Sequence, residues 1–233
     1  MTARTLSAGP ATILYDDTLV SHADEALFAP PVRAAAVGGR GAAWIVPGSE
    51  GGEWVLRHYR RGGLPAKLLD DTYLWTGLGY TRPWREWHFL AEMHALGLPV
   101  PRPVAARVLR SGIAYRGDLI TRRIPNAHSL AELLAQGAAT SIPWQVIGSC
   151  IRRFHEAGVW HADLNAHNIL VDETGGAWLI DFDRGEHRRR SGDAVWKQRN
   201  LARLQRSLRK SDLPDTVIAE GWAALLDGYT TRG

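Results

Sequence analysis

The sequence predicts an α+β protein built in two lobes, with a strand-rich first half and a mostly helical second half. Up to about residue 125, short segments with β-type composition alternate with turns around a single helical pattern. From residue 126 onward, helical periodicity dominates. The 233 residues suffice for one large domain in two lobes, so we expect lobes at 1–125 and 126–233.

The first lobe contains two pairs of extended segments. "AAWIV" (42–46) and "EWVLRHY" (53–59) are rich in residues that favour strands, and "PGSEGG" between them has the composition of a turn. "LPVPRPVAARVL" (98–109) is predicted to be extended, because prolines are excluded from helix interiors. "AYRGDLITRRI" (114–124) predicts a further hairpin and strand.

One helix is expected inside this lobe, at "RPWREWHFLAEMHALG" (82–97), where Gly97 marks its end. Its spacing places four side chains on one side: Trp84, Trp87, Leu90 and His94.

The second lobe begins with a capping box, formed by Ser129 and Glu132. A second helix is predicted at 144–158, ended by Gly158, and two more around 195–210 and 214–229. The one cysteine, Cys150, excludes an internal disulfide and is expected to be a small buried hydrophobic residue.

Composition narrows the class of protein. The formal net charge is +4, and the N-terminus lacks the apolar core of a signal peptide. The longest apolar runs fall far below the roughly 20 residues of a spanning helix. These features favour a cytosolic protein.

The stretch "HADLNAHN" (161–168) combines an Asp and an Asn five positions apart, and a second Asp follows the strand pattern "AWLI" at Asp181. Two strands joined in a hairpin would present these three side chains together. Oxygen ligands of this kind suit a divalent metal ion, and one carboxylate remains to orient a hydroxyl group. Phosphoryl transfer to an alcohol has these requirements.

The pattern resembles the catalytic loop and metal-binding motif of the protein-kinase-like fold. The match is H-x-D-L-x-x-x-N from His161 to Asn168, followed by D-F-x at Asp181. The resemblance implies that Asp163 accepts the proton of the attacking hydroxyl. It implies that Asn168 and Asp181 bind the Mg²⁺ ions that bridge the phosphates of ATP, and that His161 supports the loop.

The first lobe offers the partners that this resemblance implies. Gly39 and Gly41 would let backbone amides approach the phosphates. Arg57 stands where a third-strand lysine is expected, and Lys67 is the alternative cation. Glu86 is the candidate helix glutamate that pairs with this cation. Glu92 is the alternative, and "LITRRIPN" (119–126) would be the hinge that faces adenine.

Several departures indicate an acceptor other than a peptide. Asp183 replaces the glycine after Asp-Phe, and Asn165 stands where many protein kinases have a lysine. No A-P-E motif follows, and the chain ends within about fifty residues, too few for the large helical lobe with which protein kinases seat peptides.

The full motif set resembles one family, the bacterial 3-deoxy-D-manno-octulosonic acid (Kdo) kinases, which are related to the lipopolysaccharide core heptose kinases. The resemblance spans about 35–210 and is carried by "GGRGAAW", "VLRHYRRGG", "TRPWREWHFL", "GLPVPRPVAAR", "HADLNAHNILVD" and "LIDFDRGE". It implies phosphate transfer from ATP to the 4-hydroxyl of Kdo on a Kdo-lipid A precursor. The reaction would take place at the cytoplasmic face of a Gram-negative inner membrane, with no nucleic acid as partner.

The arginine clusters fit an anionic glycolipid at a membrane surface. We expect anion contacts from Arg60, Arg61, Arg184 and Arg188–Arg190. The spacing of Arg199, Arg203 and Arg206 predicts one basic helix side that docks on headgroups, with Arg209 nearby. The alternative is that these arginines pair with acids such as Glu186 and Asp193.

Three other functions remain open from the sequence. An aminoglycoside-type phosphotransferase would need an acidic acceptor pocket, which the arginine-rich flanks disfavour. A nucleotide-binding pseudokinase scaffold would explain the missing lysine but not the intact Asp163, Asn168 and Asp181. A nucleic-acid-binding module would leave the ordered acids unexplained.

Overall fold

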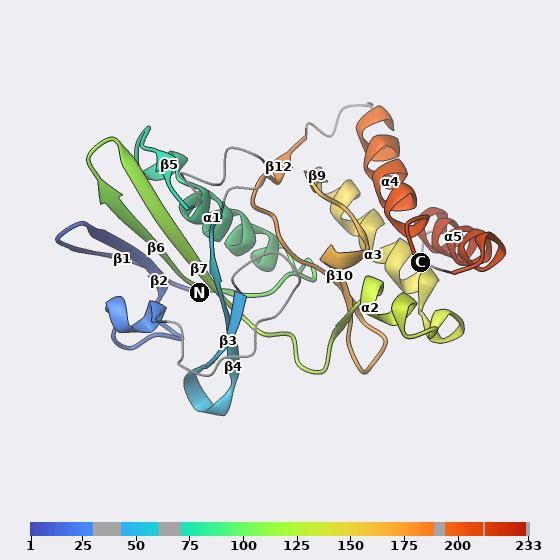
Figure 1. Ribbon diagram of the computed structural model, residues 1–233, viewed down its shortest axis with the longest axis horizontal. Helices are drawn as coiled ribbons and strands as arrows, with labels where there is room; N and C mark the ends of the chain where they lie inside the picture. Colours follow the sequence, from blue (N-terminus) through green and yellow to red (C-terminus); the bar gives the residue numbers. More distant parts are fainter. Residues whose placement is uncertain (30–42, 61–70, 189–193, 212, 232–233) are drawn as a thin grey trace. The chain divides into compact units, whose positions relative to one another are not determined.

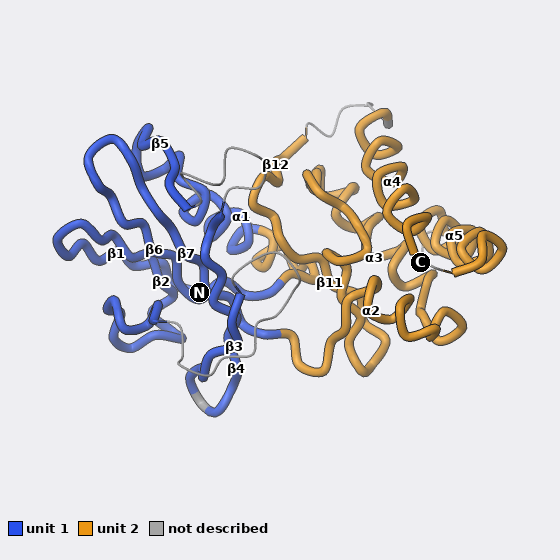
Figure 2. The backbone as a smooth tube through the Cα atoms, in the orientation of Figure 1, with its two compact units in different colours: residues 1–92, 101–123 blue, residues 93–100, 124–233 orange. Residues whose placement is uncertain are grey.

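The computed structural model describes residues 1–29, 43–60, 71–188, 194–211 and 213–231 (Figure 1). It divides into two compact units, one of residues 1–92 with 101–123 and the other of residues 93–100 with 124–233 (Figure 2). The chain passes to the second unit for good after Arg123. The segment 93–100 also belongs to the second unit, which the sequence did not predict.

The first unit is built on a seven-stranded antiparallel sheet in the order β1-β2-β6-β7-β4-β3, with β5 paired to β7. The strands are β1 (Ala3–Ala8), β2 (Ala11–Asp16), β3 (Ala43–Pro47), β4 (Glu53–His58), β5 (Tyr73–Leu74), β6 (Pro103–Ser111) and β7 (Ala114–Arg122). Short 3-10 turns lie at η1 (Glu25–Phe28), η2 (Ser49–Gly51) and η4 (Leu78–Tyr80). The predicted strands over β3, β4, β6 and β7 are therefore confirmed.

The N-terminal hairpin β1–β2 was not predicted. Ala8 pairs with Ala11, so the loop is the dipeptide Gly9–Pro10, and Gly9 has a left-handed φ of +55°. Glycine adopts this backbone conformation readily, which favours a two-residue turn. The dipeptide was thus a turn signal that the sequence contained. Strand β2 pairs with β6 and extends the sheet beyond the segments that carry the motifs.

The predicted helix is present as α1 (Arg82–Ala95), but its buried side differs from the prediction. Trp87 and Leu90 are buried as expected, whereas His94 is exposed. Glu86 takes part in the buried side, with 2% of its surface exposed. A carboxylate is placed there only with a partner, since burial of an unpaired charge is costly.

The second unit combines short strands with four helices among its described residues. The helices are α2 (Leu130–Ala135), α3 (Trp144–Glu156), α4 (Ala194–Leu208) and α5 (Asp215–Thr230). The strands are β8 (His128–Ser129), β9 (Val159–Trp160), β10 (Ile169–Val171), β11 (Ala177–Leu179) and β12 (Glu186–His187), with 3-10 turns η5 (Ala139–Ser141) and η6 (Ala166–Asn168). They pair as β11-β10-β8 and β12-β9. The capping box of Ser129 and Glu132 is confirmed.

Helices α3 and α5 lie against each other through glycines (Figure 1). A Cβ at Gly148 of α3 would overlap the carbonyl oxygen of Leu225 and stand 2.8 Å from the backbone nitrogen of Tyr229. A Cβ at Gly228 of α5 would overlap the carbonyl oxygen of Gln145. The two backbones therefore approach too closely for any side chain at these positions. Cys150, on the same helix α3, is buried as predicted, and burial raises the pKa of its thiol to about 12.

We predict that Gly148→Ala lowers the free energy of unfolding by ~1–3 kcal/mol, because the new methyl group forces the two helix backbones apart. The melting temperature should fall by ~2–4 °C for each kcal/mol lost. Gly79→Ala is the matched control, since a Cβ there would meet no atom within 4 Å. Equal melting temperatures for Gly148→Ala and Gly79→Ala would contradict the close contact.

Candidate active site

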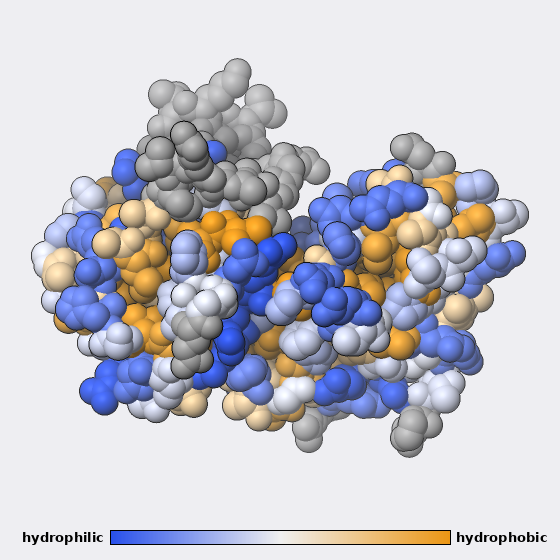
Figure 3. Space-filling view, turned by 90° about the horizontal axis from the view of Figure 1, so that it is seen from below, coloured by the Kyte–Doolittle hydropathy of each residue, from blue (hydrophilic) through white to orange (hydrophobic). Residues whose placement is uncertain are grey.

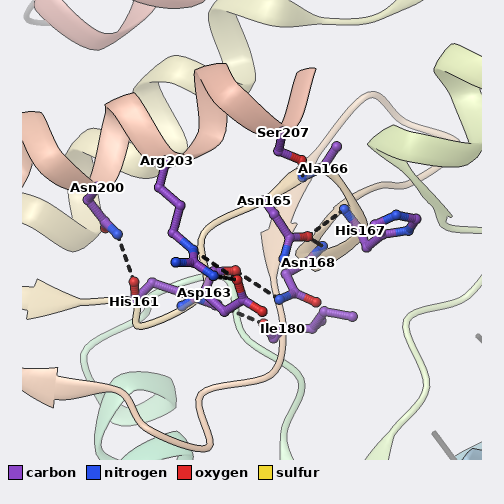
Figure 4. Close-up of polar contacts among 10 residues, drawn as sticks. All are labelled: His161, Asp163, Asn165, Ala166, His167, Asn168, Ile180, Asn200, Arg203 and Ser207. Carbon is purple, nitrogen blue, oxygen red and sulfur yellow. Dashed lines mark hydrogen bonds and ion pairs between the residues drawn. The ribbon is translucent and has the colours of Figure 1, made fainter. Parts of the chain in front are cut away.

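The loop 161–168 lies between β9 and β10 and is held by its own side chains (Figure 4). The Asn165 carboxamide oxygen accepts hydrogen bonds from the backbone N–H groups of His167, at 2.8 Å, and Asn168, at 3.2 Å. Asn165 is thereby the N-cap of η6. Leu164 is fully buried, which anchors the loop in the core of the unit. The Asn that replaces the expected lysine is thus a structural cap.

His161 supports the loop, as the resemblance to the protein-kinase-like fold implied. Its Nδ1 accepts a hydrogen bond from the backbone N–H of Asp163 at 3.1 Å, and its Nε2 donates to the carbonyl oxygen of Ile180 at 2.8 Å. These partners require the neutral tautomer with the proton on Nε2. Burial lowers the pKa of His161 below its ordinary value, although the hydrogen bond to Ile180 opposes this. The His161 ring packs on the ring of Phe182, with 4.6 Å between the two ring centroids.

Asn168 and Asp181 are brought together by the backbone. The Asn168 side-chain nitrogen donates to the carbonyl oxygen of Asp163 at 2.9 Å, and the carbonyl oxygen of Asn168 accepts from Ile180 N–H at 3.1 Å. The carboxamide nitrogen of Asn168 is therefore engaged by the loop, while its oxygen is the atom left for a ligand. Asp181 has a left-handed φ of +65°, uncommon for a residue other than glycine. A turn follows at Asp183 and Arg184.

The Asp163 carboxylate is paired with Arg203 of α4, a contact that the sequence did not predict. Arg203 donates to Oδ1 of Asp163 from Nε, at 2.9 Å, and from Nη2. Burial alone would raise the pKa of Asp163, but hydrogen bonds from Arg203 and Asn165 lower it below its usual range. Asp163 is therefore ionised at neutral pH. Asn200 of α4 also contacts the loop, donating to the carbonyl oxygen of His161 at 2.7 Å.

The predicted helix is present as α4, and its Arg203 pairs with an acid of its own unit, Asp163. Pairing of this kind is what the sequence left open as the alternative to headgroup docking. Arg188 pairs with Glu186 at 2.5 Å, which is the alternative pairing that the sequence left open. Helical spacing groups residues on one side but does not show which partner lies opposite them.

In the first unit, Arg57 of β4 forms an ion pair with Glu86 of α1, which confirms the predicted pairing. The Arg57 side chain is 25% exposed and that of Glu86 1%. Tyr59 completes the group: its hydroxyl donates to Glu86 Oε2 at 2.5 Å, and the Arg57 guanidinium lies 4.8 Å from its ring centroid.

Tyr59 keeps its proton in this arrangement, because burial and the charge of Glu86 raise its pKa well above the ordinary value. Glu86 therefore receives both a charged and a neutral donor. Gly39, Gly41 and the alternative cation Lys67 lie outside the described residues.

The described residues contain no group of three or more His, Cys, Asp or Glu side chains that could enclose a metal ion. A metal at Asn168 and Asp181 would thus take its other ligands from water and from a bound phosphate. Mg²⁺ is bound in this way in proteins, through one or two carboxylate or amide oxygens with several waters retained. The donor set of oxygens fits Mg²⁺.

Known proteins match most of the length of this chain. The family model described as "Lipopolysaccharide kinase (Kdo/WaaP) family" matches residues 32–229. The 3-deoxy-D-manno-octulosonic acid kinase of Xanthomonas campestris pv. campestris (strain B100) is 48% identical over 207 residues, which cover 87% of this chain and 82% of the relative. The protein of the same name from Stenotrophomonas maltophilia is 45% identical over the same length.

A solved structure described as "WaaP in complex with acyl carrier protein" matches the fold with a TM-score of 0.57 at 16% identity. The match covers 90% of this chain and 82% of that one, and it confirms the predicted α+β, protein-kinase-like fold. The family model and the relatives named above show that the chain belongs to the lipopolysaccharide kinase (Kdo/WaaP) family and is a phosphotransferase that acts on a hydroxyl group.

Proposed function

We propose that this protein transfers the γ-phosphoryl group of ATP to the 4-hydroxyl of Kdo in a Kdo-lipid A precursor. Relatives named as Kdo kinases, 45–48% identical over most of the chain, support the sugar. The observation that carries the chemistry is the arrangement of the loop: Asp163 is ionised, and one imidazole, His161, holds its backbone.

Asp163 accepts the proton of the attacking hydroxyl in this proposal. Phosphoryl transfer depends mainly on positioning and charge stabilisation, so the carboxylate chiefly orients the alcohol for in-line attack. Both contacts from Arg203 fall on Oδ1, so the arginine leaves Oδ2 of Asp163 for the acceptor. Side-chain exposure of 42% at Asp163 is compatible with access by a sugar.

Asn168 and Asp181 would hold Mg²⁺ through their oxygen atoms. The ion supplies positive charge that neutralises the phosphates during transfer. The Asn168 side chain is suited to this because its nitrogen is already bound to the carbonyl oxygen of Asp163, which fixes the direction of its oxygen. The left-handed backbone of Asp181 sets the direction in which its side chain leaves the chain.

Arg57 would contact the phosphates of ATP, as a lysine at this position of the third strand does in the resembling fold. A guanidinium binds phosphate oxygens by two parallel hydrogen bonds and is always charged. Glu86 and Tyr59 fix the direction of Arg57. Gly39 and Gly41 would bring backbone amides to the same phosphates.

An acceptor anchored by lipid would bring the protein to the cytoplasmic face of the inner membrane. No helix among the described residues is long and apolar enough to cross a bilayer. Arg60 and Arg184 are exposed, and each basic residue near an anionic surface contributes ~1 kcal/mol of attraction. The face drawn in Figure 3 shows hydrophilic side chains interspersed with apolar areas.

A transfer assay with labelled ATP and a panel of acceptors tests this function. The panel contains a Kdo-lipid A precursor, the same lipid without Kdo, an aminoglycoside and a generic protein. We expect label only in the Kdo-containing lipid, with the phosphate mapped to the 4-hydroxyl. Label in the aminoglycoside or in the lipid without Kdo would contradict the assignment, and nucleotide binding without any transfer would indicate a scaffold.

We predict that Asp163→Asn lowers kcat by about 10²-fold or more, because the acceptor hydroxyl loses its proton acceptor. The KM for ATP should stay within about twofold, since Asp163 faces the alcohol and not the phosphates in this proposal. Glu220→Gln, at an exposed position of α5, is the charge-matched control and should be silent. A kcat above about a tenth of the wild-type value for Asp163→Asn would count against the role.

We predict that Arg57→Met lowers the free energy of unfolding by ~3–5 kcal/mol, because the buried carboxylate of Glu86 loses its ion pair with Arg57. The double variant Arg57→Met/Glu86→Gln should recover much of that loss. Arg57→Lys should keep the ion pair and raise the KM for ATP, because an ammonium lacks the planar fork of a guanidinium.

The exposed pair of Arg123 and Glu53 is the control for this experiment. Arg123→Met should cost no more than ~1 kcal/mol. If Arg57→Met proved as stable as Arg123→Met, or if Arg57→Lys left the KM for ATP unchanged, the proposed double role of Arg57 would be wrong.

A further inference from the structure

One side of α4 contacts the loop 161–168 at three points (Figure 4). Asn200 donates to the carbonyl oxygen of His161, Arg203 donates to the carboxylate of Asp163, and Ser207 Oγ accepts from Ala166 N–H at 3.0 Å. Positions 200, 203 and 207 follow helical spacing, so they lie on one side of the helix. A single helix therefore meets the start, the middle and the end of the loop.

Asn200, on this side of α4, is held by a buried hydrogen-bond network that reaches α3 and α5. Asn200 is 2% exposed, and its Oδ1 lies 3.1 Å from His155 Nε2. His155 Nδ1 lies 2.8 Å from the Tyr229 hydroxyl of α5. Burial lowers the pKa of His155 to about 4, so the imidazole is neutral and donates to Asn200 from Nε2. Residues of α3 and α5 thus hold the helix from which Arg203 projects.

The contact between Arg203 and Asp163 is well suited to positioning and poorly suited to stabilising the fold. The two side chains are 47% and 42% exposed, and ion pairs with such exposure contribute only ~0–1 kcal/mol to stability. Yet Arg203 directs two donors of its guanidinium to one oxygen, which restricts rotation of the carboxylate. The position two after Asp163 offers no cation, because Asn165 is used as a cap.

We propose that Arg203 is a positioning residue for the transfer reaction. It holds Oδ1 of Asp163 and thereby presents Oδ2 to the acceptor hydroxyl. The cation that contacts Asp163 is therefore Arg203 of α4, which lies 40 residues farther along the chain, and not a residue of the loop itself. This inference rests on the proposed role of Asp163.

A double-mutant cycle of Arg203→Met and Asp163→Asn tests the inference in the full-length protein. Because a misplaced carboxylate can cost ~10²-fold, we expect Arg203→Met to lower kcat by ~10- to 100-fold. The KM for ATP should change by less than about twofold, because Arg203 acts through Asp163. In the Asp163→Asn background, Arg203→Met should change the residual rate by less than about threefold, since the carboxylate that Arg203 orients is replaced by a carboxamide that cannot accept the proton.

Arg203→Lys should have a higher kcat than Arg203→Met, because lysine restores the positive charge but not the paired donors of the planar guanidinium. Lys210→Met, which removes an exposed cation just after α4, is the control and should keep kcat within about twofold. Melting temperatures of all variants should lie within ~4 °C of the wild type, which excludes unfolding as the cause.

Three results would overturn the inference: wild-type kcat in Arg203→Met, an equal loss in both backgrounds, or a loss confined to KM. A loss of the same size in Lys210→Met would also overturn it. If the wild type leaves the Kdo acceptor unphosphorylated, the proposed substrate is wrong. The same cycle measured on acceptor-independent ATP hydrolysis then judges Arg203 separately.

Discussion

The candidate site depends on the two hydrogen bonds that the imidazole of His161 makes. One ring binds the backbone of Asp163 through Nδ1 and the carbonyl oxygen of Ile180 through Nε2, so it joins the loop that carries Asp163, the proposed base, to the segment that leads into Asp181. Only the neutral ring can make both contacts, because the imidazolium has no acceptor for the Asp163 N–H. Burial favours this neutral form, and the stacked rings of Phe182 and Phe154 exclude water from one side.

Asp163 and Arg57 are each held by partners within their own unit. In the second unit, Arg203 binds Asp163, and in the first, Glu86 and Tyr59 hold Arg57. Groups that are already oriented lose little freedom when a substrate binds, and preorganised charge is the main source of rate enhancement in phosphoryl transfer. Arg57 in the first unit and Arg203 in the second are therefore already oriented for the roles proposed for them.

Much of this could be predicted from sequence, because local signals were strong. The capping box at Ser129, the helix over α1 and the strands β3 and β4 follow from short-range patterns, and each is present. The pairing of Arg57 with Glu86 came from the resemblance to a known fold, not from periodicity. Arg203 could not be predicted, since nothing local indicates which of several exposed arginines on α4 meets Asp163 across 40 residues. The hairpin β1–β2 was missed although Gly9–Pro10 signals a turn.

The state of the His161 ring is the most direct measure of this account. Nitrogen-15 NMR of the imidazole reports the tautomer and the protonation state together. We predict a signal for a proton on Nε2 and a bare Nδ1, unchanged as the pH falls from 8 through the ordinary histidine pKa of about 6.5. The ring stays neutral through this range because the pKa of His161 is lowered, so protonation begins only when the pH drops below that lowered value. Titration of His161 to the imidazolium near pH 6.5, or a proton on Nδ1, would contradict the claim that this neutral ring holds the site together.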